Sequence, residues 1–344
     1  MSTIKTALLS FGMSGRVFHA PFISLHKGFE LAGAWERSKK QIQEVYPGVT
    51  SYPSLESVLA EDSIQLVVIN TPTNTHYEYT KAALLAGKDV VVEKAFTTTV
   101  SEAMELKALA ERKGLKISVY QNRRWDSDFK TVQKVKQSGV LGNIVDATLR
   151  FERYKPALGA KLHKEIPGPG AGLLNDLGPH LIDQALCLFG MPQALYADVR
   201  TIRENSLVDD WFEISLQYKN TRVQLRSSLL VCKQLPGFVL NGTKGSFVKS
   251  RADVQEVNLL AGMMPGNSDW GTEPKEEAGI LYSGDNEMEE IKTAQGNYYD
   301  YYDGIFKALT QNNPMPVTCD DGINVMKTIE AAVKSSEEKK VVSL

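Results

Sequence analysis

Cysteine is scarce in this sequence, which has only Cys187, Cys232 and Cys319, spaced far apart. An odd and scattered set excludes a disulfide framework and every Cys-x-x-Cys metal or redox motif. The HxxxH and HExxH patterns and any mixed Cys/His cluster are also missing, so we predict no metal site. The GxSxG elbow of serine hydrolases does not occur either.

Long hydrophobic runs are missing too. No stretch approaches the ~20 apolar residues that cross a bilayer, and the first apolar run leads into a glycine loop instead of a signal-peptide cleavage site. Neither sign of charge is in excess, because 39 Lys and Arg stand against 41 Asp and Glu, for a formal net charge of −2. This balance gives no reason to expect nucleic acid or a membrane as a partner. We therefore expect a cytoplasmic protein.

The 344 residues suffice for two domains of ~150 residues each, and the first third alternates between strand and helix patterns. Apolar runs separated by helices predict a doubly wound parallel sheet, the Rossmann arrangement. Ser101 is predicted to be the N-cap of the helix that ends at Lys113. The predicted strands are Thr6–Phe11, Phe29–Trp35, Leu66–Asn70, Asp89–Val92 and Lys116–Tyr120, and the predicted helices are Ser38–Tyr46, Ser54–Ala60, His76–Ala86 and Ser101–Lys113.

After Tyr120 the pattern changes, because strand candidates follow one another with few helices between them, which favours antiparallel pairing. The polar, glycine-rich stretch 262–290 is predicted to be a long surface excursion. We place the domain boundary between residues 122 and 123, giving a cofactor domain over 1–122 and a substrate and oligomerisation domain over 123–344. The predicted strands are Ile144–Tyr154, Leu195–Ile202, Phe212–Tyr218, Arg222–Leu230, Phe238–Leu240 and Ser246–Lys249, and the predicted helices are Phe129–Ser138, Leu181–Phe189, Tyr298–Gln311 and Cys319–Ser336.

The first strand runs into Ser10-Phe11-Gly12-Met13-Ser14-Gly15, a dinucleotide fingerprint in which Ser10 replaces the first glycine. Gly12 would let the backbone approach a pyrophosphate, and Gly15 would let the next helix lie close to the strand. The alternative is a glycine turn without a ligand.

Glu36 stands at the end of the second strand, where such folds place an acidic residue for the ribose. Its carboxylate could accept both adenosine ribose hydroxyls, which favours NAD. Arg37, Ser38, Lys39 and Lys40 follow, and they could instead hold a 2′-phosphate, which favours NADP, or simply begin a helix.

Two further strands end in polar residues, Thr71–His76 and Glu93–Lys94, at the carboxyl edge where ligands of doubly wound sheets bind. The cation of Lys94 could stabilise a developing alkoxide there. The alternatives are a surface lysine and, for His76, a helix-start residue that touches no ligand.

Asp176 and His180 lie four residues apart beside Pro179, which suits a first helical position. The carboxylate could orient the imidazole, and histidine is the usual group for moving a hydroxyl proton near neutral pH. A structural helix cap is the alternative. His19 and His26 are expected to pack or to face solvent.

Together these segments resemble the Gfo/Idh/MocA oxidoreductases, over nearly the whole chain. Val17–Phe22, Arg123–Phe129 and Pro179–Gln184 are similar to the bacterial branch that contains NADP-dependent scyllo-inositol dehydrogenases. The resemblance implies a Rossmann domain followed by a larger, mostly antiparallel α/β domain whose open sheet mediates oligomerisation. We therefore expect a homo-oligomer, a dimer or tetramer. Ala95 departs from the family pattern, which has proline after the lysine.

The resemblance implies hydride transfer between NAD or NADP and a secondary alcohol of an inositol, sugar or other polyol. It assigns catalysis to Lys94, Asp176 and His180. The alternatives are a cofactor-sensing regulator without activity and a glycosidase-like enzyme that recycles bound NAD. Expected cofactor contacts are Phe11, Gly12, Met13, Ser14, Gly15, Glu36, Arg37, Thr71, Pro72, Asn74, His76, Glu93, Lys94 and Asn122, and expected substrate contacts are Arg123, Trp125, Tyr154 and His163.

Overall fold

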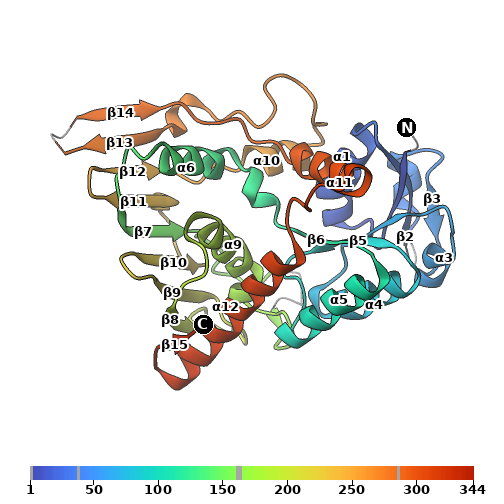
Figure 1. Cartoon of the computed structure of the whole chain (residues 1–344), viewed down its shortest axis with the longest axis horizontal. Helices are drawn as coiled ribbons and strands as arrows, with labels where there is room; N and C mark the ends of the chain where they lie inside the picture. The colour runs from blue at the N-terminus through green and yellow to red at the C-terminus, as the bar shows by residue number, and fades with distance from the viewer. Residues whose placement is uncertain (1–2, 37–38, 160–164, 285–286) are drawn as a thin grey trace. The chain divides into compact units, whose positions relative to one another are not determined.

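A computed structural model describes residues 3–36, 39–159, 165–284 and 287–344 (Figure 1). By the contacts of its Cα atoms the chain forms two compact units, and both are discontinuous in sequence. The first unit contains Met1–Asn122, Gln255–Trp270 and Asn297–Ile323, and the second contains Arg123–Val254, Gly271–Gly296 and Asn324–Leu344. The assignment of cofactor binding to 1–122 and of substrate binding and oligomerisation to 123–344 stays a prediction.

The first unit is built on a six-stranded sheet with the order β3-β2-β1-β4-β5-β6, in which every pairing is parallel. This order confirms the predicted doubly wound sheet and places its switch point between β1 and β4. The short edge strand β3 was not predicted. The strands are β1 (Ile4–Leu8), β2 (Phe29–Trp35), β3 (Thr50–Tyr52), β4 (Leu66–Ile69), β5 (Asp89–Glu93) and β6 (Ile117–Tyr120).

The crossover helices end within one residue of their predicted ends, but their starts differ more. The helices α4 (His76–Leu85) and α5 (Val100–Lys113) lie side by side on the sheet (Figure 1). The prediction of Ser101 as the N-cap of α5 is wrong, because Thr99 and Glu102 form a reciprocal capping box and Ser101 lies inside the helix. The shorter segments of this unit are α2 (Gln41–Val45), α3 (Leu55–Leu59), α10 (Val254–Leu260) and the 3₁₀ turn η2 (Thr73–Thr75).

The glycine loop leads into a single π-helical turn, η1 (Gly15–His19), followed by α1 (Ala20–Leu25). Pro21 has no backbone N–H and cannot donate to a carbonyl one turn back, which explains why a regular helix is interrupted here. Helix α11 (Tyr299–Gln311), although distant in sequence, contacts α1.

The second unit carries a nine-stranded sheet with the order β14-β13-β12-β11-β7-β10-β9-β8-β15. All its pairings are antiparallel except the one between β7 and β10, so the expected open and mostly antiparallel sheet is confirmed. The strands are β7 (Ile144–Arg150), β8 (Ala194–Arg200), β9 (Trp211–Gln217), β10 (Arg222–Ser228), β11 (Phe238–Gly242), β12 (Gly245–Lys249), β13 (Gly279–Ser283), β14 (Met288–Ile291) and β15 (Val342–Ser343).

The stretch 262–290, predicted to be a long surface excursion, contains two strands in its second half, because β13 and β14 pair there and extend the sheet (Figure 1). Their alternation is weak, since most β14 residues are exposed, and this hid them from pattern analysis. The helical segments of the second unit are α6 (Ser127–Ser138), α8 (Leu173–Asp176), α9 (Gly178–Phe189), α12 (Cys319–Glu338, from Asn324 on) and the 3₁₀ turns η3 (Asn122–Trp125, from Arg123 on) and η4 (Lys275–Glu277).

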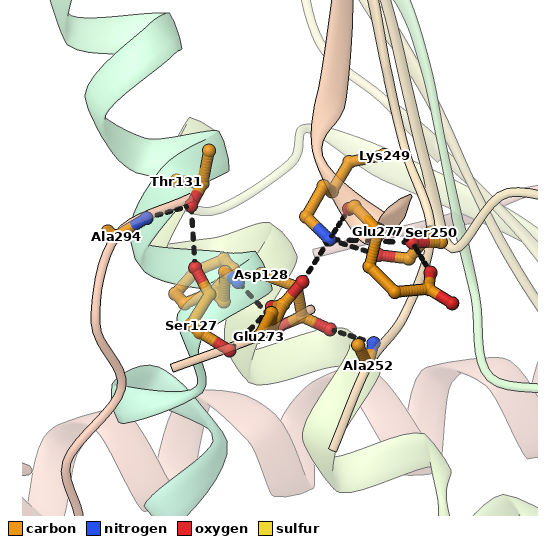
Figure 2. Close-up of polar contacts among 10 residues, drawn as sticks. Ser127, Asp128, Thr131, Lys249, Ser250, Ala252, Glu273, Glu277 and Ala294 are labelled. Atoms are coloured by element: carbon orange, nitrogen blue, oxygen red, sulfur yellow. Dashed lines mark hydrogen bonds and ion pairs between the residues drawn. The ribbon is translucent and has the colours of Figure 1, made fainter. Parts of the chain in front are cut away.

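A buried polar cluster fastens the segment before β13 to the end of β12 and to α6 (Figure 2). The Lys249 ammonium donates to Glu273 Oε2 at 2.6 Å and to the Glu277 carbonyl at 2.6 Å. The side chains of Lys249 and Glu273 are both 0% exposed. Asp128 accepts hydrogen bonds from the backbone nitrogens of Phe129 and Ala252. These contacts compensate the charges that folding removes from water.

The edge of β8 is covered by α12. The hydroxyl oxygens of Ser335 and Ser336 accept hydrogen bonds, each of 2.9 Å, from the backbone nitrogens of Ala197 and Val199. β15 pairs with β8 only at Leu195 and Ala194, so the two serines supply hydrogen-bond acceptors for the β8 residues beyond this pairing.

Candidate active site

The glycine loop is held by a reciprocal pair of hydrogen bonds between Ser10 and Asn70, which follow β1 and β4. The Ser10 nitrogen donates to Asn70 Oδ1 at 3.0 Å, and Asn70 Nδ2 donates to the Ser10 carbonyl at 2.8 Å. The Ser10 hydroxyl also accepts from the Gly12 nitrogen at 3.1 Å. The serine that replaces the first glycine of the fingerprint therefore closes the loop.

The loop fits a dinucleotide at this switch point. A Cβ on Gly15 would lie 2.2 Å from the Ser10 carbonyl oxygen and 2.8 Å from Asn70 Nδ2, so only glycine allows this close packing. Gly12 and Met13 are exposed, and a Cβ on Gly12 would meet no atom nearer than Ser10 Oγ at 3.3 Å. Phe11, in contrast, is buried and contacts Tyr46.

Glu36 has local partners for its carboxylate. Its Oε1 accepts from the Gln41 nitrogen at 2.9 Å, and its Oε2 accepts from the Ile42 nitrogen and from the Ser51 hydroxyl, both at 3.2 Å. A carboxylate offers about four lone-pair positions, and three are used here. Glu36 thus caps the start of α2, and its contact with a ribose stays a prediction. Arg37 lies outside the described residues.

His76 joins the two loops that follow β4 and β5. Its Nδ1 faces the Ala95 carbonyl at 2.8 Å, and its Nε2 faces the Thr71 carbonyl at 2.9 Å. Burial lowers the pKa of His76, against hydrogen bonds to Thr71 and Ala95 that act to raise it. His76 is 1% exposed, so it packs beneath the two loops that it joins. Pro72 and Asn74 are exposed.

Glu93 and Lys94 end β5 and begin the next loop. Glu93 Oε1 accepts from the Ser14 hydroxyl and lies 3.1 Å from His19 Nε2, while Oε2 accepts from the Lys94 nitrogen at 3.2 Å. Burial works to raise the pKa of Glu93, but the hydrogen bond and charge of His19, followed by Ser14 and Lys94, lower it to about 2. Lys94 is half-buried, the Lys94–Ala95 peptide bond is cis, and Ala95 is buried.

In the second unit, Asp176 ends α8 and His180 lies in the first turn of α9. Pro179 occupies the first helical turn, as predicted, although the helix begins three residues before the predicted start at Leu181. Asp176 is half-buried, and His180 is 6% exposed with its ring 6.3 Å from that of Phe151. Leu177 is the single residue between the two helices, so both side chains are carried by rigid backbone.

Asp209 fixes the start of α8. Its Oδ2 accepts from the Leu174 nitrogen at 2.6 Å, and its carbonyl accepts from the Leu173 nitrogen at 2.8 Å. Gly172, at φ 86°, leaves room for this carboxylate, because a Cβ there would lie 1.9 Å from Asp209 Oδ1. Burial raises the pKa of Asp209 to about 6, against the Leu174 hydrogen bond, which lowers it.

The residues after Asn122 are held by ion pairs. Arg123 is 5% exposed and its Nη1 binds Asp126 and Asp253, while Arg124 makes two hydrogen bonds to Asp183 of α9, at 2.8 and 2.7 Å. These pairs hold both arginine side chains within the second unit. Among the other expected contacts, Asn122 is 5% exposed, Trp125 is half-buried, Tyr154 is 57% exposed, and His163 lies outside the described residues.

Within the ranges that the structure describes, no group of three or more His, Cys, Asp or Glu residues could hold a metal ion. Among the helices of these same residues, none has the length and apolar character of a membrane span.

Three residues beside these sites were missed by the sequence analysis: His19, Asn70 and Asp209. His19 was expected to pack or to face solvent, and it is buried, but its contact with Glu93 was not predicted, because the π turn that directs it there is not visible in a pattern. Asn70 directly follows a predicted strand at the switch point, and that position could have indicated it. Asp209 carries no such signal.

Comparison with known proteins agrees with this architecture. Residues 4–121 match the NAD-binding Rossmann fold of the GFO_IDH_MocA oxidoreductase family, and residues 134–344 match the family's C-terminal α/β domain. The chain is 37% identical over 347 residues to the scyllo-inositol 2-dehydrogenase (NADP(+)) IolW of Bacillus subtilis, covering 100% of this chain and 97% of IolW.

Solved structures are similar over the same extent. The Bacillus subtilis protein yvaA matches with a TM-score of 0.97 at 37% identity, covering 100% of this chain and 99% of yvaA. A Bacteroides fragilis protein matches with a TM-score of 0.92 at 44% identity, covering 100% of both chains.

The fold and the two family matches define a nicotinamide-dependent oxidoreductase with a Rossmann domain. The chain belongs to the Gfo/Idh/MocA family, as the resemblance implied.

Proposed function

We propose that this protein oxidises a secondary alcohol of an inositol, sugar or other polyol, and reduces the corresponding ketone or lactone in the reverse direction. The observation that carries the proposal is the Asp176–His180 pair at the junction of α8 and α9, in a chain of this oxidoreductase family. The name of the Bacillus subtilis relative, a scyllo-inositol dehydrogenase, supports the same class of substrate.

The proton of the substrate hydroxyl passes to an imidazole nitrogen of His180, which serves as general base. Asp176 orients this imidazole and stabilises the positive charge that it acquires. The ammonium of Lys94 stabilises the developing alkoxide. The nicotinamide, when bound, supplies the hydride acceptor.

The exposed glycine loop would hold the pyrophosphate with its backbone and with the positive end of the turn that follows. We propose NADP as the preferred cofactor. Glu36 directs its carboxylate to α2 and Ser51, which argues against NAD, and Lys39 and Lys40 are exposed beside it. The relative named for NADP supports this preference.

A nicotinamide-absorbance screen tests the proposal. The purified chain is assayed with inositols, aldoses and polyols, with NADP and NAD in parallel. Net accumulation of reduced cofactor with a polyol is expected, and His180→Ala and Lys94→Ala should lower kcat far more than they weaken cofactor binding. Cofactor binding without turnover of any alcohol would favour a regulator, and turnover without net reduction would favour a cofactor-recycling enzyme.

A further inference from the structure

His19 and Glu93 form a buried pair that the proposed reaction does not use. The side chain of His19 is 0% exposed and that of Glu93 is 14% exposed. Both ring nitrogens of His19 have partners, Glu93 Oε1 at 3.1 Å from Nε2 and the Tyr302 hydroxyl at 2.6 Å from Nδ1. The π turn η1 brings His19 to this position.

The partners determine how the protons are arranged. An ionised carboxylate only accepts hydrogen bonds, so Nε2 of His19 must carry a proton and donate it to Glu93. Burial raises the pKa of Tyr302 well above 10, so its hydroxyl keeps its proton and can donate to Nδ1. Both ring nitrogens of His19 are therefore engaged, Nε2 by Glu93 and Nδ1 by Tyr302.

The other contacts of Glu93 are with the glycine loop and with the backbone of Lys94. The oxygen that faces His19 also accepts from the Ser14 hydroxyl in the glycine loop. The second oxygen accepts from the Lys94 backbone nitrogen at 3.2 Å. One carboxylate thus connects the loop expected to bind pyrophosphate with the residue expected to stabilise the alkoxide.

We propose that His19 and Glu93 form a latch between the glycine loop and Lys94, and that His19 is a positioning residue for both. The part that concerns Lys94 rests on the proposed function, whereas the part that concerns the glycine loop rests only on binding of a nicotinamide dinucleotide. Without His19, the Glu93 carboxylate would lose the contact that holds it beside Ser14. Loss of His19 would therefore weaken the positioning of both the glycine loop and Lys94.

His26 provides a matched control from the same unit. It is also buried, at 6% exposed, and it packs against aromatic rings, with a ring distance of 5.0 Å to Tyr299. Its polar partners are the Gly28 nitrogen and Asp303 rather than Glu93. Replacing His26 therefore removes a comparable buried ring and leaves the latch intact.

The experiment measures dissociation constants of NADP and NAD by titration calorimetry, together with melting temperatures. The variants are His19→Ala, His19→Gln, Ser14→Ala, the Ser14→Ala/His19→Ala double variant and His26→Ala. Glutamine has an amide N–H for Glu93 and a carbonyl for Tyr302, so His19→Gln is the rescue variant.

We expect His19→Ala and Ser14→Ala each to raise the dissociation constant about tenfold, the effect of one hydrogen bond to a charged group. The double variant should stay near tenfold, because both changes break the same connection, whereas independent effects would multiply to about a hundredfold. His19→Gln and His26→Ala should bind within about threefold of the wild type, although His26→Ala melts at a lower temperature.

Three results would overturn the latch. They are wild-type cofactor affinity in His19→Ala, equal losses of affinity in His19→Ala and His26→Ala, and a hundredfold loss in the double variant. If His19→Ala does not fold, His19→Phe replaces it in the cycle, because a phenyl ring fills the space but cannot donate to Glu93, and the same outcomes apply. Wild-type protein that oxidises no alcohol would refute the proposed function, and the binding series would still decide the latch.

Discussion

Asn70 and Ser10 exchange two hydrogen bonds across the switch point of the parallel sheet, one of 3.0 Å and one of 2.8 Å. Asn70 is 6% exposed, so Asn70→Ala would leave the backbone N–H and C=O of Ser10 without these partners. We expect a loss of about 1–3 kcal/mol in the free energy of unfolding and weaker cofactor binding.

Denaturant unfolding and cofactor titration check this prediction. The matched control is Thr80→Val in the same unit, because the buried Thr80 hydroxyl has no hydrogen-bond partner in the described part of the chain. That change should be close to neutral. An Asn70→Ala protein with unchanged cofactor affinity would contradict a role for this pair in shaping the loop.

Glu36 should behave as a helix cap. We expect Glu36→Gln to lower the free energy of unfolding by about 1 kcal/mol, because hydrogen bonds to the Gln41 and Ile42 nitrogens weaken. The ratio of kcat/KM for NADP to that for NAD should change little. Parallel steady-state assays with both cofactors measure it. A selective loss of NAD affinity would instead show that Glu36 binds the ribose.

Asp209 should make stability depend on pH. Burial raises its pKa from 3.8 to about 6 in the folded state, so folding favours the protonated acid. The stabilisation is present in full below pH 3.8 and is lost as the pH rises through about 6. Relative to Asp209→Asn, the wild type should therefore lose at most about 3 kcal/mol over this interval.

Urea unfolding at a series of pH values between 3.5 and 7, with both proteins, measures the difference. A difference that stays constant with pH would contradict the raised pKa. Because Asp209 holds the start of the helix that carries Asp176, the same variant also tests whether kcat depends on that support.

Lys249→Met should be strongly destabilising. It leaves the Glu273 carboxylate buried without its cation, at a cost of about 3–5 kcal/mol. The Lys249→Met/Glu273→Gln double variant removes the uncompensated charge and should recover part of the loss. Chemical denaturation of the three proteins checks this. Equal stability of Lys249→Met and the wild type would contradict the electrostatic role of the pair.

Much of the fold could be predicted, because the hydrophobic periods of the sequence and the glycines after its helices indicated the same elements. The strand Phe29–Trp35 was predicted to the residue, and α5 ends at Lys113 before the left-handed Gly114 as expected. The strands β3, β13, β14 and β15 were missed. β3 and β15 have only three and two residues, and most residues of β14 are exposed, so they carry no clear hydrophobic period. Alternation needs one buried face to be visible in a sequence.

The candidate site was less predictable, for physical reasons. Residue type and position at a strand end pointed to the glycine loop and to Glu93–Lys94. The same reasoning predicted that Glu36 binds a ribose, which stays a prediction, but it could not predict the contacts of the carboxylate within the protein. Only the three-dimensional structure shows that the Ile42 nitrogen and the Ser51 hydroxyl take its lone pairs.

Ser335 and Ser336 cover the backbone of β8 where strand pairing ends. Without these hydroxyls, the Ala197 and Val199 amides would be open to the strand of another chain, and unprotected sheet edges are where proteins begin to aggregate. Helix α12 thus protects this edge of the sheet as well as packing against it. A chain truncated just before Ser335 would expose this edge to association with the strands of other molecules, even if its first unit folds normally.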